Sequence, residues 1–158
     1  MVIYMTLFTN GYVTLKTFND FEIIPNKGDF VELSLVNPKI PMTIKFSIIP
    51  TLSSLIDFRN EMESNINQNN NISIISSNFI AVNEDVYYML VSVINNGETE
   101  IRRNEFLYIK DDNLYSFEFV YPYADAELDD FYLNIIRSMD IKKPKYILND
   151  GSYELNDN

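Results

Sequence analysis

The 158-residue sequence contains no cysteine, no histidine and no tryptophan. Without cysteine the chain has no disulfide bond and no thiol nucleophile. Without histidine it lacks the usual catalytic triads, and the two absences together exclude nearly all zinc and copper sites. The composition therefore excludes catalysis by a thiol nucleophile or a histidine base.

Basic residues are also scarce, with 12 Lys and Arg against 23 Asp and Glu and a net charge of −11. Nucleic-acid binding calls for clustered Lys and Arg, so the composition argues against it. No apolar run approaches the roughly 20 residues that a membrane helix needs. The segment Met1 to Asn10 has no basic residue, which argues against a signal peptide. We expect a cytoplasmic protein, with a mature exported form as the alternative.

Apolar residues make up 46% of the chain, enough for one globular domain with a single core. Two short β-favouring runs, Ile3 to Phe8 and Tyr12 to Thr17, flank Asn10-Gly11 and predict a first hairpin. A second hairpin is predicted for Phe30 to Val36 and Met42 to Ile49, because the prolines between them belong in a turn.

The middle of the chain predicts a helix followed by a meander. Thr51 or Ser54 can cap a helix over about 52–67, and Ser54 and Asp57 are spaced as a capping box. The expected apolar stripe of this helix consists of Leu52, Leu55, Ile56, Met62 and Ile66. Four consecutive strands then follow with short, turn-like dividers, which indicates antiparallel pairing. Their expected bounds are Ile72 to Val82, Val86 to Ile94, Thr99 to Ile109 and Leu114 to Tyr121.

The last of these strands is predicted to be half-buried, because every second residue along it is aromatic. The aromatic row consists of Tyr115, Phe117, Phe119 and Tyr121. A helix over about 125–139 follows, with an apolar stripe at spacings of three and four. The stripe consists of Leu128, Phe131, Tyr132, Ile135, Ile136 and Met139. We expect this second helix to pack on the aromatic row.

The resulting fold class is α+β, a single-domain αβ sandwich on a mostly antiparallel sheet of about six or more strands with two main helices. One domain is expected over residues 1–143, and residues 144–158 are expected to form a tail or a small hairpin.

The stretch from Leu52 to Lys142 resembles the PsbP superfamily, whose branches include Ran-binding Mog-type proteins, DcrB-like proteins and adaptors of type VI secretion effectors. The resemblance is carried by Leu55-Ile56-Asp57-Phe58, Asn78-Phe79-Ile80-Ala81-Val82, Asn113-Leu114-Tyr115-Ser116-Phe117 and Ile136-Arg137-Ser138-Met139. It implies an αβ sandwich and a non-enzymatic role in binding or assembling other proteins.

Two clusters of charged residues are candidates for a functional site. The acids at the start of the second helix, Asp125, Glu127, Asp129 and Asp130, suit the positive end of a helix dipole better than a calcium loop, since no glycine supplies the sharp turn. Arg103, Glu105 and Glu118 should share one face of the meander as cross-strand ion pairs. We therefore assign no metal site, no cofactor and no catalytic residue.

The aromatic residues are the remaining candidates for a binding site, because tyrosine is enriched at protein–protein interfaces. Tyr121 and Tyr123 surround Pro122 before the second helix and are the candidate partner-binding residues, with packing inside the fold as the alternative. The expected function is a non-catalytic protein-binding or adaptor module with a protein partner. The alternative is a small-molecule-binding protein or an acid-residue enzyme with a pocket on the sheet.

Overall fold

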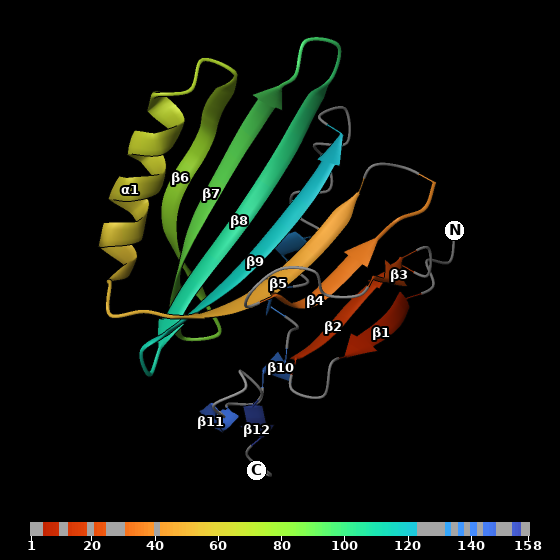
Figure 1. Ribbon diagram of the computed structural model, residues 1–158, viewed down its shortest axis with the longest axis vertical. Coiled ribbons are helices and arrows are strands. Elements are labelled where there is room, and N and C mark those ends of the chain that lie inside the picture. The colour runs from red at the N-terminus through yellow and green to blue at the C-terminus, as the bar shows by residue number, and fades with distance from the viewer. Residues whose placement is uncertain are drawn as a thin grey trace.

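Figure 1 shows the computed structural model of the chain. The structure describes residues 5–9, 13–18, 21–24, 31–39, 42–122, 132–133, 136–137, 140–141, 144–147 and 153–155. Side-chain burial is described for 21–24, 33–39, 42–122, 132–133 and 136–137.

The largest element is a seven-stranded sheet in which every neighbouring pair is antiparallel. Its spatial order is β3 (Glu22–Ile23), β4 (Val31–Val36), β5 (Thr43–Pro50), β9 (Asn113–Pro122), β8 (Glu100–Lys110), β7 (Asp85–Asn95) and β6 (Ile72–Val82). The predicted second hairpin corresponds to β4 and β5, and the predicted meander to β6 through β9. The antiparallel α+β architecture is confirmed in these parts.

Two hairpins of the meander close through two-residue turns with positive φ at both positions. These residues are Asn83 (φ 49°) and Glu84 (φ 75°) before β7, and Asp111 (φ 51°) and Asp112 (φ 60°) before β9. Positive φ at both central residues defines the type I′ turn, whose twist matches that of the flanking strands. Asn and Asp tolerate this region better than most side chains, so local sequence chemistry sets the register of both hairpins.

The sheet becomes continuous where β5 pairs with β9, from Thr43 opposite Val120 to Pro50 opposite Asn113. In this register Phe46 lies opposite Phe117, and their ring centroids are 4.7 Å apart. A stacked aromatic pair of this kind adds to the burial of both rings. The pairing joins residues about seventy positions apart in sequence, and it makes β9 the central strand.

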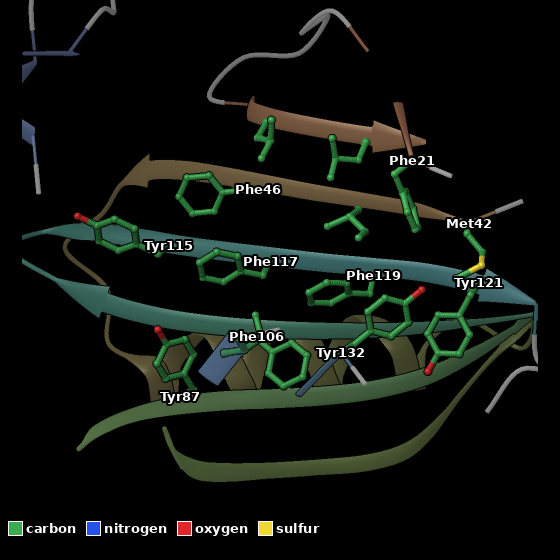
Figure 2. Close-up of a cluster of buried hydrophobic side chains, with 14 of the residues drawn as sticks. Phe21, Met42, Phe46, Tyr87, Phe106, Tyr115, Phe117, Phe119, Tyr121 and Tyr132 are labelled. Atoms are coloured by element: carbon green, nitrogen blue, oxygen red, sulfur yellow. The ribbon is translucent and has the colours of Figure 1, made fainter. Parts of the chain in front are cut away.

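One face of the sheet, here called the aromatic face, carries the main core (Figure 2). The predicted row on β9 is buried, with relative exposures from 0% to 3% for Tyr115, Phe117, Phe119 and Tyr121. Neighbouring strands add further buried rings to this face, namely Phe46, Tyr87 and Phe106. The period-two prediction for β9 is therefore confirmed.

Part of the predicted second helix packs on the aromatic face. Only Tyr132, Leu133, Ile136 and Arg137 of residues 125–139 are described, and each has helical geometry. Tyr132 is fully buried, with its ring 4.5 Å from Phe119 and 5.0 Å from Tyr121. Its packing agrees with the prediction, but the full second helix and the two-layer sandwich that it would complete remain predictions.

The opposite face of the sheet carries α1 (Leu55–Asn67), which begins at the predicted capping box. Asp57 accepts a bond from the Ser54 backbone N–H, and Ser54 Oγ accepts one from the Asp57 N–H. These bonds hold the pKa of Asp57 below its usual range. No helix in the described part of the chain is long and apolar enough to span a membrane.

The predicted stripe of α1 is partly wrong. Leu52 is 93% exposed because it precedes the N-cap, and Ile56 is 55% exposed because it lies about 100° around the helix from Leu55. The stripe that packs on the sheet contains the buried Ile66 and the half-buried Leu55, Phe58 and Met62. It packs on a second cluster formed by Tyr88, Leu90, Leu107 and Leu114.

The chain ends form smaller sheets. The predicted first hairpin is present as β1 (Met5–Thr9) and β2 (Val13–Phe18), although its Asn10-Gly11 turn lies outside the described residues. β2 also pairs with β10 (Asp140–Ile141). β11 (Pro144–Ile147) pairs with β12 (Tyr153–Leu155). The division of the chain at residue 143 remains a prediction.

We expect Phe117→Ala to lower the free energy of unfolding by about 3 to 5 kcal/mol, as large-to-small changes in a core do. Phe117 is 1% exposed at the centre of the aromatic face. Urea denaturation measures the change, with exposed Lys110→Ala as the control. A loss below about 1 kcal/mol would contradict the assignment of the aromatic face as the main core.

Candidate protein-interaction site

The structure places Tyr121 in the core. It lies within β9 and not in a loop, and it is 0% exposed with its ring against Tyr132. The ring therefore has no free surface to offer a partner, because Tyr121 ends the aromatic row of β9 and packs inside the fold, the alternative that the sequence left open. Tyr123 lies outside the described residues, so its role in partner binding stays a prediction.

The acidic residues considered as helix caps or calcium ligands, Asp125, Glu127, Asp129 and Asp130, also lie outside the described residues. Their capping role stays a prediction. Within the described ranges, no three acidic side chains are grouped closely enough to hold a metal ion.

Arg103, Glu105 and Glu118 lie on the same face of the sheet as α1. The ion pair runs along β8, with Arg103 Nε 3.5 Å from Glu105 Oε2. Glu118 of β9 lies directly opposite Glu105. The expected cross-strand ion pairs are therefore wrong, because the register of β8 and β9 sets two carboxylates against each other.

Glu105 is the most perturbed carboxyl in this group. Its side chain is 13% exposed, and burial raises its pKa to about 7. Glu118 raises the pKa further, whereas Arg103 lowers it. Buried carboxyls with raised pKa values occur at catalytic sites, and also in structural ion pairs. The group therefore identifies Glu105 as a residue of interest without defining a reaction.

Apolar exposure is concentrated elsewhere, along the sheet edge formed by β6. Among the described strands only β7 pairs with β6, so β6 ends the sheet, beside α1 (Figure 1). β6 is 11 residues long and contains neither a charged residue nor a proline. Natural edge strands are usually short, charged or interrupted by proline, since an open edge attracts other strands. The opposite edge follows that rule, because β3 has two residues, one of them Glu22.

The turn before β7 determines which backbone groups of β6 point outward. In a two-residue hairpin the flanking pair, here Val82 and Asp85, exchanges both hydrogen bonds, and such pairs alternate along the ladder. The inward-facing N–H groups of β6 near the turn therefore belong to Val82, Ile80 and Asn78. Those of Ala81, Phe79 and Ser77 face away from β7 and lie along the open edge.

Side chains of α1 contact residues of β6 and show which face of this strand lies beneath the helix. Glu63 Oε1 accepts a 2.5 Å hydrogen bond from Ser77 Oγ, which lies 2.7 Å from Tyr88 Oη. The Arg59 guanidinium lies 5.3 Å from the ring centroid of Phe79, within range of a cation–π contact. Glu63 and Arg59 of α1 thus lie over Ser77 and Phe79 of β6. Ile56, three residues before Arg59, lies on the same side of α1 and one turn nearer the Ala81 end of the strand.

Exposed apolar side chains follow this edge. Phe79 is 38% exposed and Ile75 is 49% exposed at a bulge in the ladder. Val86, the partner of Ala81 on β7, is 56% exposed, and Ile56 of α1 is 55% exposed. We call Ile56, Ile75, Phe79 and Val86, with the outer backbone of β6, the β6 edge surface. Exposed apolar groups beside unpaired backbone are typical of protein-interaction sites.

The sequence carried a signal for this surface that composition alone did not reveal. The run from Ile72 to Val82 has no charged residue, although the chain as a whole carries 35 charged residues among 158. Its length and apolar character suit either a central or an edge strand. Only the strand order shows that it lies at an edge.

Comparison with known proteins gives matches of structure alone. No protein-family model matches the chain, and no curated protein matches it. PsbP of Synechocystis sp. PCC 6803 (CyanoP) has a TM-score of 0.62 at 13% identity, covering 89% of this chain and 94% of that chain. The Ran-binding protein Mog1p of Saccharomyces cerevisiae has a TM-score of 0.64 at 10% identity, covering 89% and 96%.

A third similar structure is LpqN of Mycobacterium tuberculosis, which is described as involved in cell envelope biogenesis. Its TM-score is 0.60 at 10% identity, covering 89% of this chain and 92% of that chain. The chain therefore has an open antiparallel α+β architecture. More specifically, it has the PsbP-like fold that is also found in Mog1p, as the sequence resemblance implied.

We expect Glu105 to make stability fall as the pH rises. Its folded pKa of about 7 exceeds the ordinary value of 4.5, so its contribution is fully present below about pH 4.5 and is lost as the pH rises through 7. Between about pH 4.5 and pH 8, Glu105→Gln should gain roughly 2 to 4 kcal/mol relative to wild type. Urea denaturation across this pH range measures the difference.

Exposed Glu61→Gln on α1 is the matched control for a lost carboxylate and should follow the wild-type curve. If Glu105→Gln and wild type lose stability in parallel across this range, the pKa of Glu105 is not raised by burial.

Proposed function

We propose that this chain is a non-catalytic protein-binding module that contacts its partner through the β6 edge surface. The observation that carries the proposal is the combination of exposed Ile56, Phe79 and Val86 with an uncharged strand edge. A soluble domain leaves such a surface open at the risk of unwanted association, so its retention favours a binding role. Apolar side chains would supply the buried centre of an interface, and the surrounding acids its polar rim.

The fold neighbours support a binding role by analogy. Mog1p is a Ran-binding protein, so this fold serves the recognition of a protein in at least one case. At 10% identity the partner of Mog1p does not carry over. An adaptor role, in which the module holds one protein for another, is a narrower form of the same proposal.

Tyr123 is a proposed second contact. The sequence paired it with Tyr121, whose ring is buried, so the proposal now rests on Tyr123 alone. In the sequence it follows Pro122, the last residue of β9.

The alternative function is that of a small-molecule-binding protein or an acid-residue enzyme on the sheet. The raised pKa of Glu105 and the opposed carboxylate of Glu118 favour it. A two-carboxylate mechanism needs both groups at a substrate, whereas Glu105 is occupied by Arg103 and is 13% exposed. We therefore place this alternative second.

We expect the paired substitution Phe79→Ser and Val86→Ser to weaken capture of a partner from the source cell by at least about tenfold while the fold is retained. Anchoring apolar side chains at an interface each contribute more than about 1 kcal/mol. Quantitative capture on immobilised protein, with circular dichroism to verify folding, measures the effect. The partner should be recovered stoichiometrically with wild type.

The matched control is Ile23→Ser, which removes an equally exposed apolar residue (57%) from the opposite edge. A separate Tyr123→Ser variant tests the second contact. Equal recovery by wild type and the folded Phe79 and Val86 variant would refute the β6 edge surface as the binding site.

A further inference from the structure

The two edges of the seven-stranded sheet differ in a way that suggests how a partner would bind. β3 offers two residues, whereas β6 offers 11 residues without a charge or a proline. Resting on the proposed function, we propose that β6 binds a partner by strand addition. The partner strand would be an extended segment with an uncharged, β-favouring centre and Lys or Arg at its flanks.

The backbone supplies the docking groups. The N–H and C=O groups of Ser77, Phe79 and Ala81 all face the open edge, by the alternation that the type I′ turn sets. An added strand can therefore form a regular ladder with this part of β6. In such complexes the main-chain bonds give affinity, and pockets for alternate side chains give specificity.

Side chains flank this ladder on both faces of the sheet. On the α1 face an added strand would pack its residues against Phe79, whose ring Arg59 approaches at 5.3 Å, and toward Ile56. On the opposite face it would meet Ile80 and the exposed Asn78. Alternate partner residues would therefore bury apolar surface at Phe79 on one side and meet one apolar and one polar side chain, Ile80 and Asn78, on the other.

The charges around the edge favour basic flanks on the partner. Glu84 and Asp85 lie exposed at the turn that ends β6, and Asp57 and Glu61 are exposed on α1. A second copy of the chain would bring a further charge of −11 to the same edge, which opposes self-association. A strand flanked by Lys or Arg is instead steered toward it, and its binding weakens as salt is added.

The test starts from a display library of random linear peptides about fifteen residues long, long enough to span a strand of typical length. Selection on folded wild-type protein should enrich alternating Val, Ile and Thr with flanking Lys or Arg. The best peptide is then synthesised, and its affinity is measured by fluorescence polarisation for each variant at low and high salt.

Ala81→Pro removes an outward N–H while leaving the inward ladder of β6 intact, as prolines on edge strands do. It should weaken the selected peptide by at least about tenfold, the effect expected of a key interface contact. Ala81→Val retains the N–H and should bind within about threefold of wild type. In the wild-type complex the amide hydrogens of Ser77, Phe79 and Ala81 should become protected from exchange. This readout decides the matter if Ala81→Pro does not fold.

The outcomes separate the binding mode from the binding function. Loss of binding in Phe79→Ser with full binding in folded Ala81→Pro would overturn strand addition and leave the binding surface standing. Selection of helical or acidic peptides, or unchanged exchange of the three amides on binding, would also overturn strand addition. Binding unaffected by both variants would overturn the binding surface as well. A concentration-dependent dimer in sedimentation, abolished by Ala81→Pro, would assign the edge to a second copy and overturn the proposed partner.

Discussion

The fold depends on burying one side of a single strand. β9 is central in the sheet, and its alternate residues Tyr115, Phe117, Phe119 and Tyr121 lie on the aromatic face with at most 3% exposure. Because the period of a strand is two, moving β9 by one residue would place these four rings on the opposite face. Their burial therefore fixes the register with β5 and β8. It also provides the floor on which Tyr132 and Ile136 pack.

The same constraint accounts for the edges. β9 needs partners on both sides, and the chain supplies β5 and β4 on one side and β8, β7 and β6 on the other. On the β4 side the sheet ends in a two-residue strand, whereas on the other side it ends in the 11-residue β6. α1 covers one face of β6 and leaves its outer backbone without a strand partner among the described residues. The surface proposed for binding thus arises where the sheet ends.

Local chemistry made much of this fold predictable. The positive φ values at Asn83 and Asp111 mark turns that the sequence signals with Asn and Asp, and the meander strands lie within about one residue of their expected bounds. The capping box fixed the start of α1. What failed depends on distant contacts. Leu52 was misplaced, and Tyr121 kept its place in the aromatic row but not its role as an exposed contact, because burial depends on which segments pack over a residue. Glu105 was misplaced because strand register sets it against Glu118.

The candidate site was less predictable than the fold, since an uncharged strand has the same sequence pattern in the centre and at the edge of a sheet. The central claim is that β6 ends the sheet with its outer backbone open. Amide hydrogen exchange along β6 in the free protein tests it most directly. We predict protection at Asn78, Ile80 and Val82 and rapid exchange at Ser77, Phe79 and Ala81. Uniform protection of all six amides would show that another strand already covers this edge and would contradict the account.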